Sequence, residues 1–193
     1  MRTVCVFCGS SAGANPSYVA AARELGRAIA TSGRAIVYGG ASVGLMGALA
    51  DAALDAGGSV VGVIPASMVA KELAHPRLTE LHVVKSMHER KALMAERADA
   101  FVMMPGGYGT LEEFFEVLTW AQLGLHRKPR GALDVEGYFD GLFAFIDHAV
   151  REGFLKREAL DLIVRDSDAT RLIERLAASH PPSVEKFLSP DET

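Results

Sequence analysis

The stretch from Pro105 to Glu113 has the residue types and spacing best suited to chemistry. It runs PGGYGTLEE, so that Gly106, Gly107 and Gly109 come just before two adjacent carboxylates. An apolar run precedes it and an amphipathic run follows, which predicts a strand, a glycine turn and a helix. Glycines leave the backbone N–H groups of a helix N-terminus accessible, and the helix dipole there favours an anion such as phosphate. The stretch predicts chemistry on a phosphorylated small molecule.

Glu113 is the candidate catalytic carboxylate of this stretch. A carboxylate near a bound substrate can stabilise positive charge that develops during a reaction, or it can activate a water molecule. However, Thr110 and Glu113 also have the T-x-x-E spacing of a helix capping box. The residues by themselves leave catalysis and capping equally open.

Arg90 is a second candidate site residue. A guanidinium is a permanently charged, forked donor that can hold phosphate oxygens and steer a carboxylate. The alternative is an ordinary solvent-exposed arginine, because the surrounding residues mix charges of both signs as surface helices do. These neighbours are Glu89, Lys91, Glu96 and Arg97.

The known nucleotide fingerprints are not satisfied. Glu112 stands where the third glycine of a G-x-G-x-x-G pattern belongs, and the chain has no G-x-x-x-x-G-K-[ST] sequence. A dinucleotide cofactor and a nucleoside triphosphate are therefore disfavoured, and a compact monophosphate is the simplest occupant. Two other turns, at Gly9-Ser10-Ser11 and Gly39-Gly40, could lend amides and hydroxyls to the ligand. We treat them as second-tier binding residues, because any tight turn from strand to helix needs small residues.

Cys5 and Cys8 form a C-x-x-C pair that we expect to be structural. They lie on a predicted buried strand, where positions i and i+3 point to opposite faces, whereas redox pairs occupy a helix N-terminus. The six histidines show no metal-ligand spacing, so no metal site is predicted. Four methionines are expected to fill the core rather than line a ligand pocket. They are Met87, Met94, Met103 and Met104.

The composition limits the classes of function. The chain has 193 residues, 49% of them hydrophobic, which fits a single domain with one core. A net charge of −4 argues against a general nucleic-acid or membrane-surface binder, since both need a basic face. No apolar run approaches the roughly 20 residues of a membrane span, and the start lacks the pattern of a signal peptide. We therefore expect a cytoplasmic protein that acts on a small molecule.

Short apolar segments alternate with helical ones along the whole chain. A helix capped by Asn15 is predicted from Pro16 to about Ser32, and a capping box at Ser86 predicts a helix to Arg97. Further helices are predicted at 138–152 and 169–178, with a loop or short helix at 66–80 that carries Lys71 and Glu72. The predicted strands are 3–8, 35–38, 60–65, 81–84, 100–104, 131–133 and 162–164.

This alternation predicts an α/β fold, a doubly wound, Rossmann-like parallel sheet with helices on both faces. Ligands in such folds bind beyond the carboxyl ends of the strands. The turns at Gly9, Gly39 and Gly106 all follow predicted strands, so they should lie along one edge. We expect a single nucleotide-binding domain over 1–178 and a loose tail over 179–193.

Together these motifs resemble the Lonely Guy family, the cytokinin riboside 5'-monophosphate phosphoribohydrolases, many of which were first labelled lysine decarboxylases. The similarity extends from Val4 to about Ala177. It rests on YGG followed by GLMG, on MHERK and on PGGYGTLEE followed by TWAQ.

The resemblance implies hydrolysis of the N-glycosidic bond of adenosine 5'-monophosphate or an N6-modified form of it. The products would be the free base and ribose 5-phosphate, with no metal and no organic cofactor, and the family is typically a homodimer. By motif position, Arg90 and Glu113 would be the catalytic pair. The implied substrate contacts are Glu72, Lys91, Gly106, Gly107, Tyr108, Gly109, Thr110, Leu111, Glu112 and Thr119.

Two alternatives remain beside this interpretation. A phosphate-binding turn can serve a carrier that binds a nucleotide or a molybdenum cofactor without cleaving it. Lys91 could instead form a Schiff base with pyridoxal phosphate in an amino-acid decarboxylase. The second is disfavoured, since so small a domain lacks an evident partner for the pyridinium nitrogen.

Overall fold

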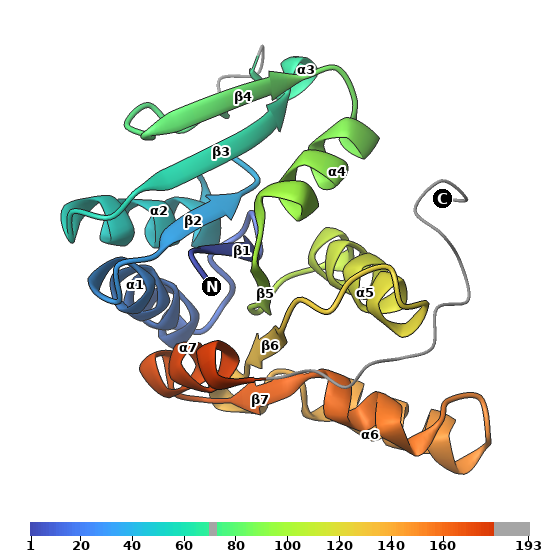
Figure 1. Ribbon diagram of the computed structural model, residues 1–193. Helices are drawn as coiled ribbons and strands as arrows, with labels where there is room; N and C mark the ends of the chain where they lie inside the picture. Colours follow the sequence, from blue (N-terminus) through green and yellow to red (C-terminus); the bar gives the residue numbers. More distant parts are fainter. Residues whose placement is uncertain (70–72, 180–193) are drawn as a thin grey trace.

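A computed structural model describes residues 1–69 and 73–179. All of its strand pairs are parallel, and one sheet has the order β4-β3-β2-β1-β5-β6-β7 (Figure 1). The strands are β1 Thr3–Phe7, β2 Ala35–Tyr38, β3 Val60–Pro65, β4 Glu80–Val84, β5 Ala100–Met103, β6 Arg130–Leu133 and β7 Val164–Asp166. The predicted doubly wound fold is confirmed.

Helices connect the strands and cover both faces of the sheet. The α-helices are α1 Pro16–Thr31, α2 Gly44–Asp55, α3 Ala66–Val69, α4 Met87–Arg97, α5 Tyr108–Gln122, α6 Asp140–Arg151 and α7 Ala169–Ala178. Two short 3-10 helices, η1 Val135–Gly137 and η2 Arg157–Leu162, precede α6 and β7. Helices α1, α2 and α7 lie on one face, and α4, α5 and α6 lie on the other (Figure 1).

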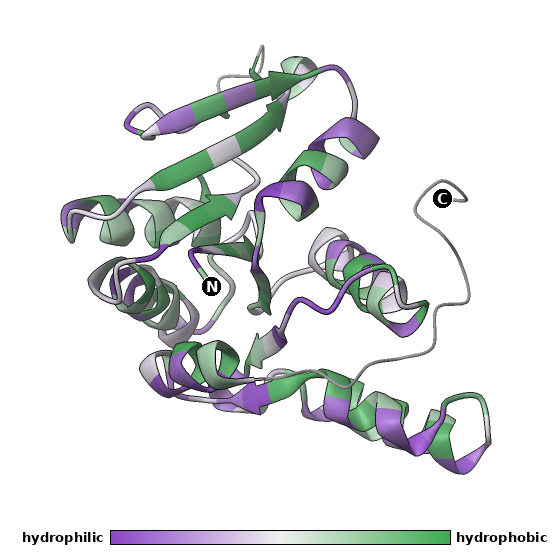
Figure 2. Ribbon diagram, in the orientation of Figure 1, coloured by the Kyte–Doolittle hydropathy of each residue, from purple (hydrophilic) through white to green (hydrophobic). Residues whose placement is uncertain are grey.

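The inner strands are buried on both faces, which explains their continuous apolar sequence. In β1, Val4 and Val6 belong to the core under α1 and α2, whereas Cys5 and Phe7 belong to the core under α4 and α5. The edge strand β4 is more exposed and alternates in hydropathy, while the neighbouring β3 is largely apolar (Figure 2).

Cys5 and Cys8 lie in different core clusters, as expected for a structural pair. Both are free and buried, and desolvation raises the pKa of each thiol. Within the described ranges, no group of three metal-ligating side chains is present. No helix of the described part of the chain is both long and apolar enough to cross a membrane.

The predicted helix starts are confirmed where a side chain caps them. Asn15 Oδ1 accepts a hydrogen bond from the Ser17 N–H at 3.0 Å, and Ser86 Oγ accepts one from the Glu89 N–H at 3.1 Å. The capping box at Ser86 is formed in one direction only. The Glu89 carboxylate accepts from the Lys85 N–H at 2.8 Å instead of closing the box on Ser86.

Two predicted boundaries near the C-terminal end are wrong. The last strand is β7, at Val164–Asp166, because Leu162 ends a 3-10 helix and its carbonyl accepts from Nε of the buried Arg130. The helix predicted at 138–152 begins instead at Asp140. Glu136 and Gly137 have positive φ angles of 53° and 68°, so the chain turns sharply just before Tyr138. The predicted tail, 179–193, lies outside the described residues except for its first residue.

The two neighbouring strands β1 and β5 are the point in the sheet from which the chain connections run in opposite directions. The chain winds outward from β1 through β2, β3 and β4, and from β5 through β6 and β7 on the other side. At the carboxyl ends the loops are joined, since the Gly9 N–H donates to the Pro105 carbonyl at 3.0 Å and the Leu45 N–H donates to the Gly9 carbonyl at 3.0 Å. This is where open α/β sheets bind ligands.

Candidate active site

Helix α5 begins one residue after Gly107, and this start decides between the two interpretations of Glu113. Gly107 is the N-cap and has no side chain to cap the helix, while Thr110 is already the third helical residue. A capping box would need Thr110 at the N-cap position. The capping interpretation is therefore wrong, and the Glu113 carboxylate is directed to another partner.

That partner is Arg90 on α4. Its Nη2 atom lies 3.4 Å from Oε1 of Glu113, and the two residues are only 6% and 8% exposed. Burial raises the pKa of Glu113 above its ordinary value, although the positive charge of Arg90 opposes this shift. The alternative of a solvent-exposed arginine is wrong, and the structure brings together the two residues proposed as a pair.

The Arg90 guanidinium lies where only a glycine leaves room for it. A Cβ atom built on Gly39, at the end of β2, would overlap the guanidinium. Nη1 donates to the sulfur of Met87 at 3.1 Å, while Nε is buried and has no hydrogen-bond partner among the described residues. A buried, unpaired donor beside a carboxylate is available to a ligand.

The methionine prediction is confirmed for three of the four residues. Met94, Met103 and Met104 are buried in the core. Met87 is wrong as core filler, because it is 43% exposed and its sulfur contacts Arg90 instead. It lies on the first turn of α4, where its side chain faces the edge of the site.

The glycines of the α5 turn have different roles. A Cβ on Gly106 would overlap the Thr110 hydroxyl and lie 2.8 Å from the Gly9 nitrogen, so the chain itself requires glycine there. Apart from the adjacent residues and the helix's own backbone, no described atom lies within 4 Å of a Cβ built on Gly107 or Gly109. The space in front of the helix N-terminus is therefore open, and Tyr108 beside it is 95% exposed.

A cavity of about 340 Å³ adjoins this turn. It opens between the carboxyl ends of β1 and β5, the position expected from the sheet order. Gly9 and Ser10 belong to its lining, which agrees with their second-tier assignment. The other lining residues are Ser11, Ala12, Gly13, Tyr18, Leu45, Pro105, Gly106, Gly107 and Tyr138.

Tyr18 and Tyr138 are site residues that the sequence analysis did not find. Their rings meet edge to face with centroids 5.5 Å apart, and the Tyr138 hydroxyl donates to the Gly106 carbonyl at 2.6 Å. No spacing pattern connects Tyr138 to the glycine turn. The only local signal is the glycine at position 137, which permits the sharp turn before it.

Lys91 and Glu112 are paired with each other on the surface between α4 and α5. Lys91 Nζ contacts the carboxylates of Glu112 and Glu116, the latter at 2.9 Å. Partial burial acts to lower the pKa of Lys91, but hydrogen bonds to these two carboxylates raise it overall. Leu111 packs against the core beneath the helix.

Thr119 lies away from the other predicted contacts. It is eleven residues beyond Tyr108 on α5, roughly 16 Å along the helix axis. Its hydroxyl donates to the Phe115 carbonyl at 2.7 Å. Within one chain, the structure does not bring Thr119 to the glycine turn.

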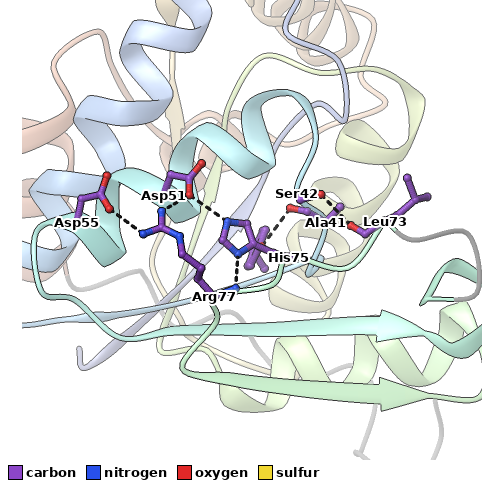
Figure 3. Close-up of polar contacts among 8 residues, drawn as sticks. Ala41, Ser42, Asp51, Asp55, Leu73, His75 and Arg77 are labelled. Atoms are coloured by element: carbon purple, nitrogen blue, oxygen red, sulfur yellow. Dashed lines mark hydrogen bonds and ion pairs between the residues drawn. The ribbon is translucent and has the colours of Figure 1, made fainter.

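The backbone at Gly40 and Ser42 is hydrogen-bonded to the segment at 73–77, which follows α3 in the chain. The Ser42 N–H donates to the Leu73 carbonyl and the His75 N–H donates to the Gly40 carbonyl, both at 2.9 Å. Behind them, His75 and Arg77 contact Asp51 on α2 (Figure 3). Gly40 thus accepts a backbone hydrogen bond next to Gly39 and is not among the residues that line the cavity. Glu72 lies outside the described residues.

Together, the fold and site define a class of protein. It is an open, parallel-sheet α/β protein with a helix N-terminus suited to phosphate, a cavity at the point where the connections diverge, and a buried Arg–Glu pair beside them. This is the architecture of a nucleotide-binding enzyme.

Comparison with known proteins identifies the family. A family model described as "possible lysine decarboxylase" matches residues 46–176, more than half of the chain. A probable cytokinin riboside 5'-monophosphate phosphoribohydrolase of Oryza sativa subsp. japonica is 53% identical, over 91% of this chain and 77% of the relative. A cytokinin riboside 5'-monophosphate phosphoribohydrolase of Arabidopsis thaliana is 48% identical, over 97% and 88%. The chain belongs to this family, the Lonely Guy family.

Solved structures support the fold. The molybdenum cofactor binding protein from Rippkaea orientalis superposes with a TM-score of 0.69 at 21% identity, covering 92% of this chain and 96% of its own. The molybdenum cofactor carrier protein from Chlamydomonas reinhardtii gives 0.66 at 21% identity, covering 92% and 99%. At this level of identity the similarity concerns the fold alone.

Proposed function

We propose that this protein hydrolyses the N-glycosidic bond of adenosine 5'-monophosphate or an N6-modified adenosine 5'-monophosphate. The products are the free adenine or cytokinin base and ribose 5-phosphate. The observation that carries the proposal is the buried pair of Arg90 and Glu113, 3.4 Å apart, beside the open N-terminus of α5. The names of the relatives, which are 48% to 53% identical, support the same reaction.

The phosphate binds at the first turn of α5. The backbone N–H groups at Gly107, Tyr108, Gly109 and Thr110 belong to the N-terminal end of this helix, where intrahelical acceptors are missing. Glu113 follows Tyr108 by five residues, roughly 7.5 Å along the axis. Glu113 therefore lies on the same helix as the phosphate-binding turn, about one and a half turns further along it.

Glu113 acts on the anomeric carbon. As the bond from C1' to the base nitrogen breaks, its electron pair leaves with the base and positive charge develops on the ribose. The Glu113 carboxylate stabilises this charge and takes a proton from the water whose oxygen bonds to C1'. The departing nitrogen takes up a proton, so the overall reaction adds one water. The positive charge of Arg90 favours the ionised form of the buried carboxylate, against the effect of burial, and Arg90 offers its unpaired Nε–H to a substrate oxygen.

Decarboxylation through Lys91 fits the site less well. A Schiff base requires a neutral amine, but the two glutamates that contact Lys91 raise its pKa. The raised pKa of Lys91 therefore does not support the activity named in the description of the matching family, a possible lysine decarboxylase.

The remaining assignments are proposals on the same basis. Glu72, Lys91 and Thr119 contact the substrate in the arrangement that the family motif implies. Thr119 lies far from the glycine turn of its own chain, so it can do so in a homodimer, where a second copy adds to the site. Light scattering after size-exclusion chromatography tests the dimer, and a monomer that retains full activity contradicts it. We further propose a cytoplasmic location and no nucleic-acid partner, in keeping with the net charge of −4.

The decisive experiment is chromatographic detection of free base and ribose 5-phosphate. The substrates are adenosine 5'-monophosphate and isopentenyladenosine 5'-monophosphate, and the proteins are wild type, Glu113→Gln and Arg90→Ala. Release of base by wild type, with loss of release in both variants, supports the proposal. Tight nucleotide binding without any release of base contradicts it and favours a carrier instead.

A further inference from the structure

The Tyr138 hydroxyl reaches the backbone of the glycine turn from a distant part of the chain. It donates to the Gly106 carbonyl at 2.6 Å, a short and well-formed O–H···O hydrogen bond. Its ring is held between two others, with the Tyr18 centroid at 5.5 Å and the Phe139 centroid at 5.0 Å, both edge to face. These two ring contacts orient the hydroxyl, although Tyr138 itself is 43% exposed.

The accepting peptide group is one that would otherwise turn easily. It joins Gly106 and Gly107, and a peptide with glycine on both sides can rotate at little steric cost. A trans peptide is planar, so its C=O and N–H point in opposite directions. The hydrogen bond from Tyr138 to the Gly106 carbonyl therefore also fixes the direction of the Gly107 N–H.

That N–H belongs to the N-cap of α5, next to the open space in front of the helix. Anion binding there depends on N–H groups that already point toward the ligand, because turning a peptide during binding weakens the interaction. Tyr138 also lines the cavity together with both glycines. A second observation points to a ligand near α5, since the buried Arg90, which contacts Glu113 on that helix, has an Nε without a hydrogen-bond partner among the described residues.

We propose that Tyr138 is a positioning residue that sets the selectivity of the site for a 5'-phosphate. It acts through the Gly106–Gly107 peptide, which it holds in the orientation that binds an anion. The inference rests on the proposed function, because it assumes that the phosphate of a nucleotide occupies the α5 turn.

The test is ligand binding by Tyr138→Phe, which removes the hydroxyl and keeps the ring. Both proteins carry Glu113→Gln so that the ligand is not consumed, and calorimetry measures the affinities for adenosine 5'-monophosphate and adenosine. We expect the dissociation constant of the nucleotide to rise about 5- to 10-fold, the effect of one hydrogen bond. The affinity for adenosine stays the same, and the melting temperature without ligand falls by only a few degrees, as expected for one partly exposed hydrogen bond.

Two outcomes overturn the inference. One is a nucleotide dissociation constant within twofold of the parent protein. The other is an equal loss of affinity for nucleotide and adenosine, which indicates a purely structural role. In an otherwise unchanged chain, Tyr138→Phe should raise KM more than it lowers kcat. If wild type binds the nucleotide without cleaving it, the proposed function fails while the phosphate selectivity of Tyr138 is still measured.

Discussion

The Nη2 atom of Arg90 lies 3.4 Å from Oε1 of Glu113, and both side chains are almost fully enclosed by the protein. The hydrogen-bonding capacity of Arg90 is not fully used, since its Nε is left unpaired within the described residues. Two buried charges, one of them incompletely satisfied, are costly for stability. Their retention next to an open helix N-terminus is best explained by a ligand that completes the arrangement.

Replacing Glu113 with glutamine should abolish most of the activity without preventing binding. Glutamine keeps the size of the side chain but cannot take a proton or carry negative charge. We expect kcat to fall by about 10²- to 10⁴-fold, as for the loss of a general base, with little change in nucleotide affinity. Steady-state kinetics and calorimetry measure the two effects. Activity close to wild type would rule out a catalytic role for this carboxylate.

The raised pKa of Glu113 gives a pH dependence. The active form is the carboxylate, so kcat/KM should decline on the acid side at a pH above the ordinary value of 4.5. Arg90→Gln removes the charge that opposes the shift, and should move this decline to higher pH. An acid limb at the same pH in both proteins would show that Arg90 does not control the ionisation.

The raised pKa of Glu113 also makes the free energy of unfolding depend on pH. The folded state holds the proton of Glu113 more tightly than the unfolded state does. Its contribution to stability is therefore present below the unfolded pKa and is lost as the pH rises through the folded pKa. Urea unfolding of wild type and Glu113→Gln across this range should show the variant gaining relative stability as the pH increases.

Gly39→Ala should displace the Arg90 guanidinium, because the added methyl group would overlap it. A shift of the catalytic pair by about 1 Å should lower kcat on the order of 100-fold. The matched control is Gly141→Ala on α6, where an added Cβ meets no described atom within 4 Å apart from adjacent residues and the helix's own backbone. It should leave kcat unchanged and stabilise the helix by about 0.5–1 kcal/mol. Equal activities of the two variants would contradict the assignment.

Gly109→Ala tests whether the open space at the α5 turn belongs to the ligand. The chain itself leaves room for the methyl group, and alanine favours helix by about 1 kcal/mol relative to glycine. The melting temperature should therefore stay the same or rise. The affinity for adenosine 5'-monophosphate should fall, because the methyl group occupies space in front of the N–H groups. Unchanged affinity in a normally folded variant would place the phosphate elsewhere.

The His75 side chain links the segment at 73–77 to Asp51 on α2 (Figure 3). Its Nδ1 atom accepts from the Arg77 N–H at 3.2 Å, and Nε2 lies 3.3 Å from the Asp51 carboxylate. His75→Ala should lower the free energy of unfolding by about 1–3 kcal/mol, measured with urea. His75→Asn keeps an acceptor for the Arg77 N–H but is too short to reach Asp51, so it should lose less. An equal loss in both variants would mean that the Asp51 contact carries the stability.

Much of the fold follows from local sequence patterns. β2 and β3 lie where their short apolar runs predict them, and Asn15 with Pro16 predicts the start of α1, because caps and periodicity are local effects. The prediction fails near β7. There Leu162 is held in a 3-10 helix by its contact with Arg130, which is 32 residues away in the chain. A contact of that range leaves no local pattern.

The sequence by itself determined the class of fold, the phosphate-type turn and the family, since these depend on hydropathy period, glycine spacing and an extended motif. The sequence left open whether Glu113 caps a helix or is a catalytic carboxylate. It also left open whether Arg90 is a solvent-exposed arginine or part of a site. The tertiary structure excluded capping for Glu113 and a solvent-exposed position for Arg90, because burial and the meeting of α4 with α5 depend on how the helices pack against the sheet. For the same reason, only the folded chain brings the Tyr138 hydroxyl to the Gly106 carbonyl.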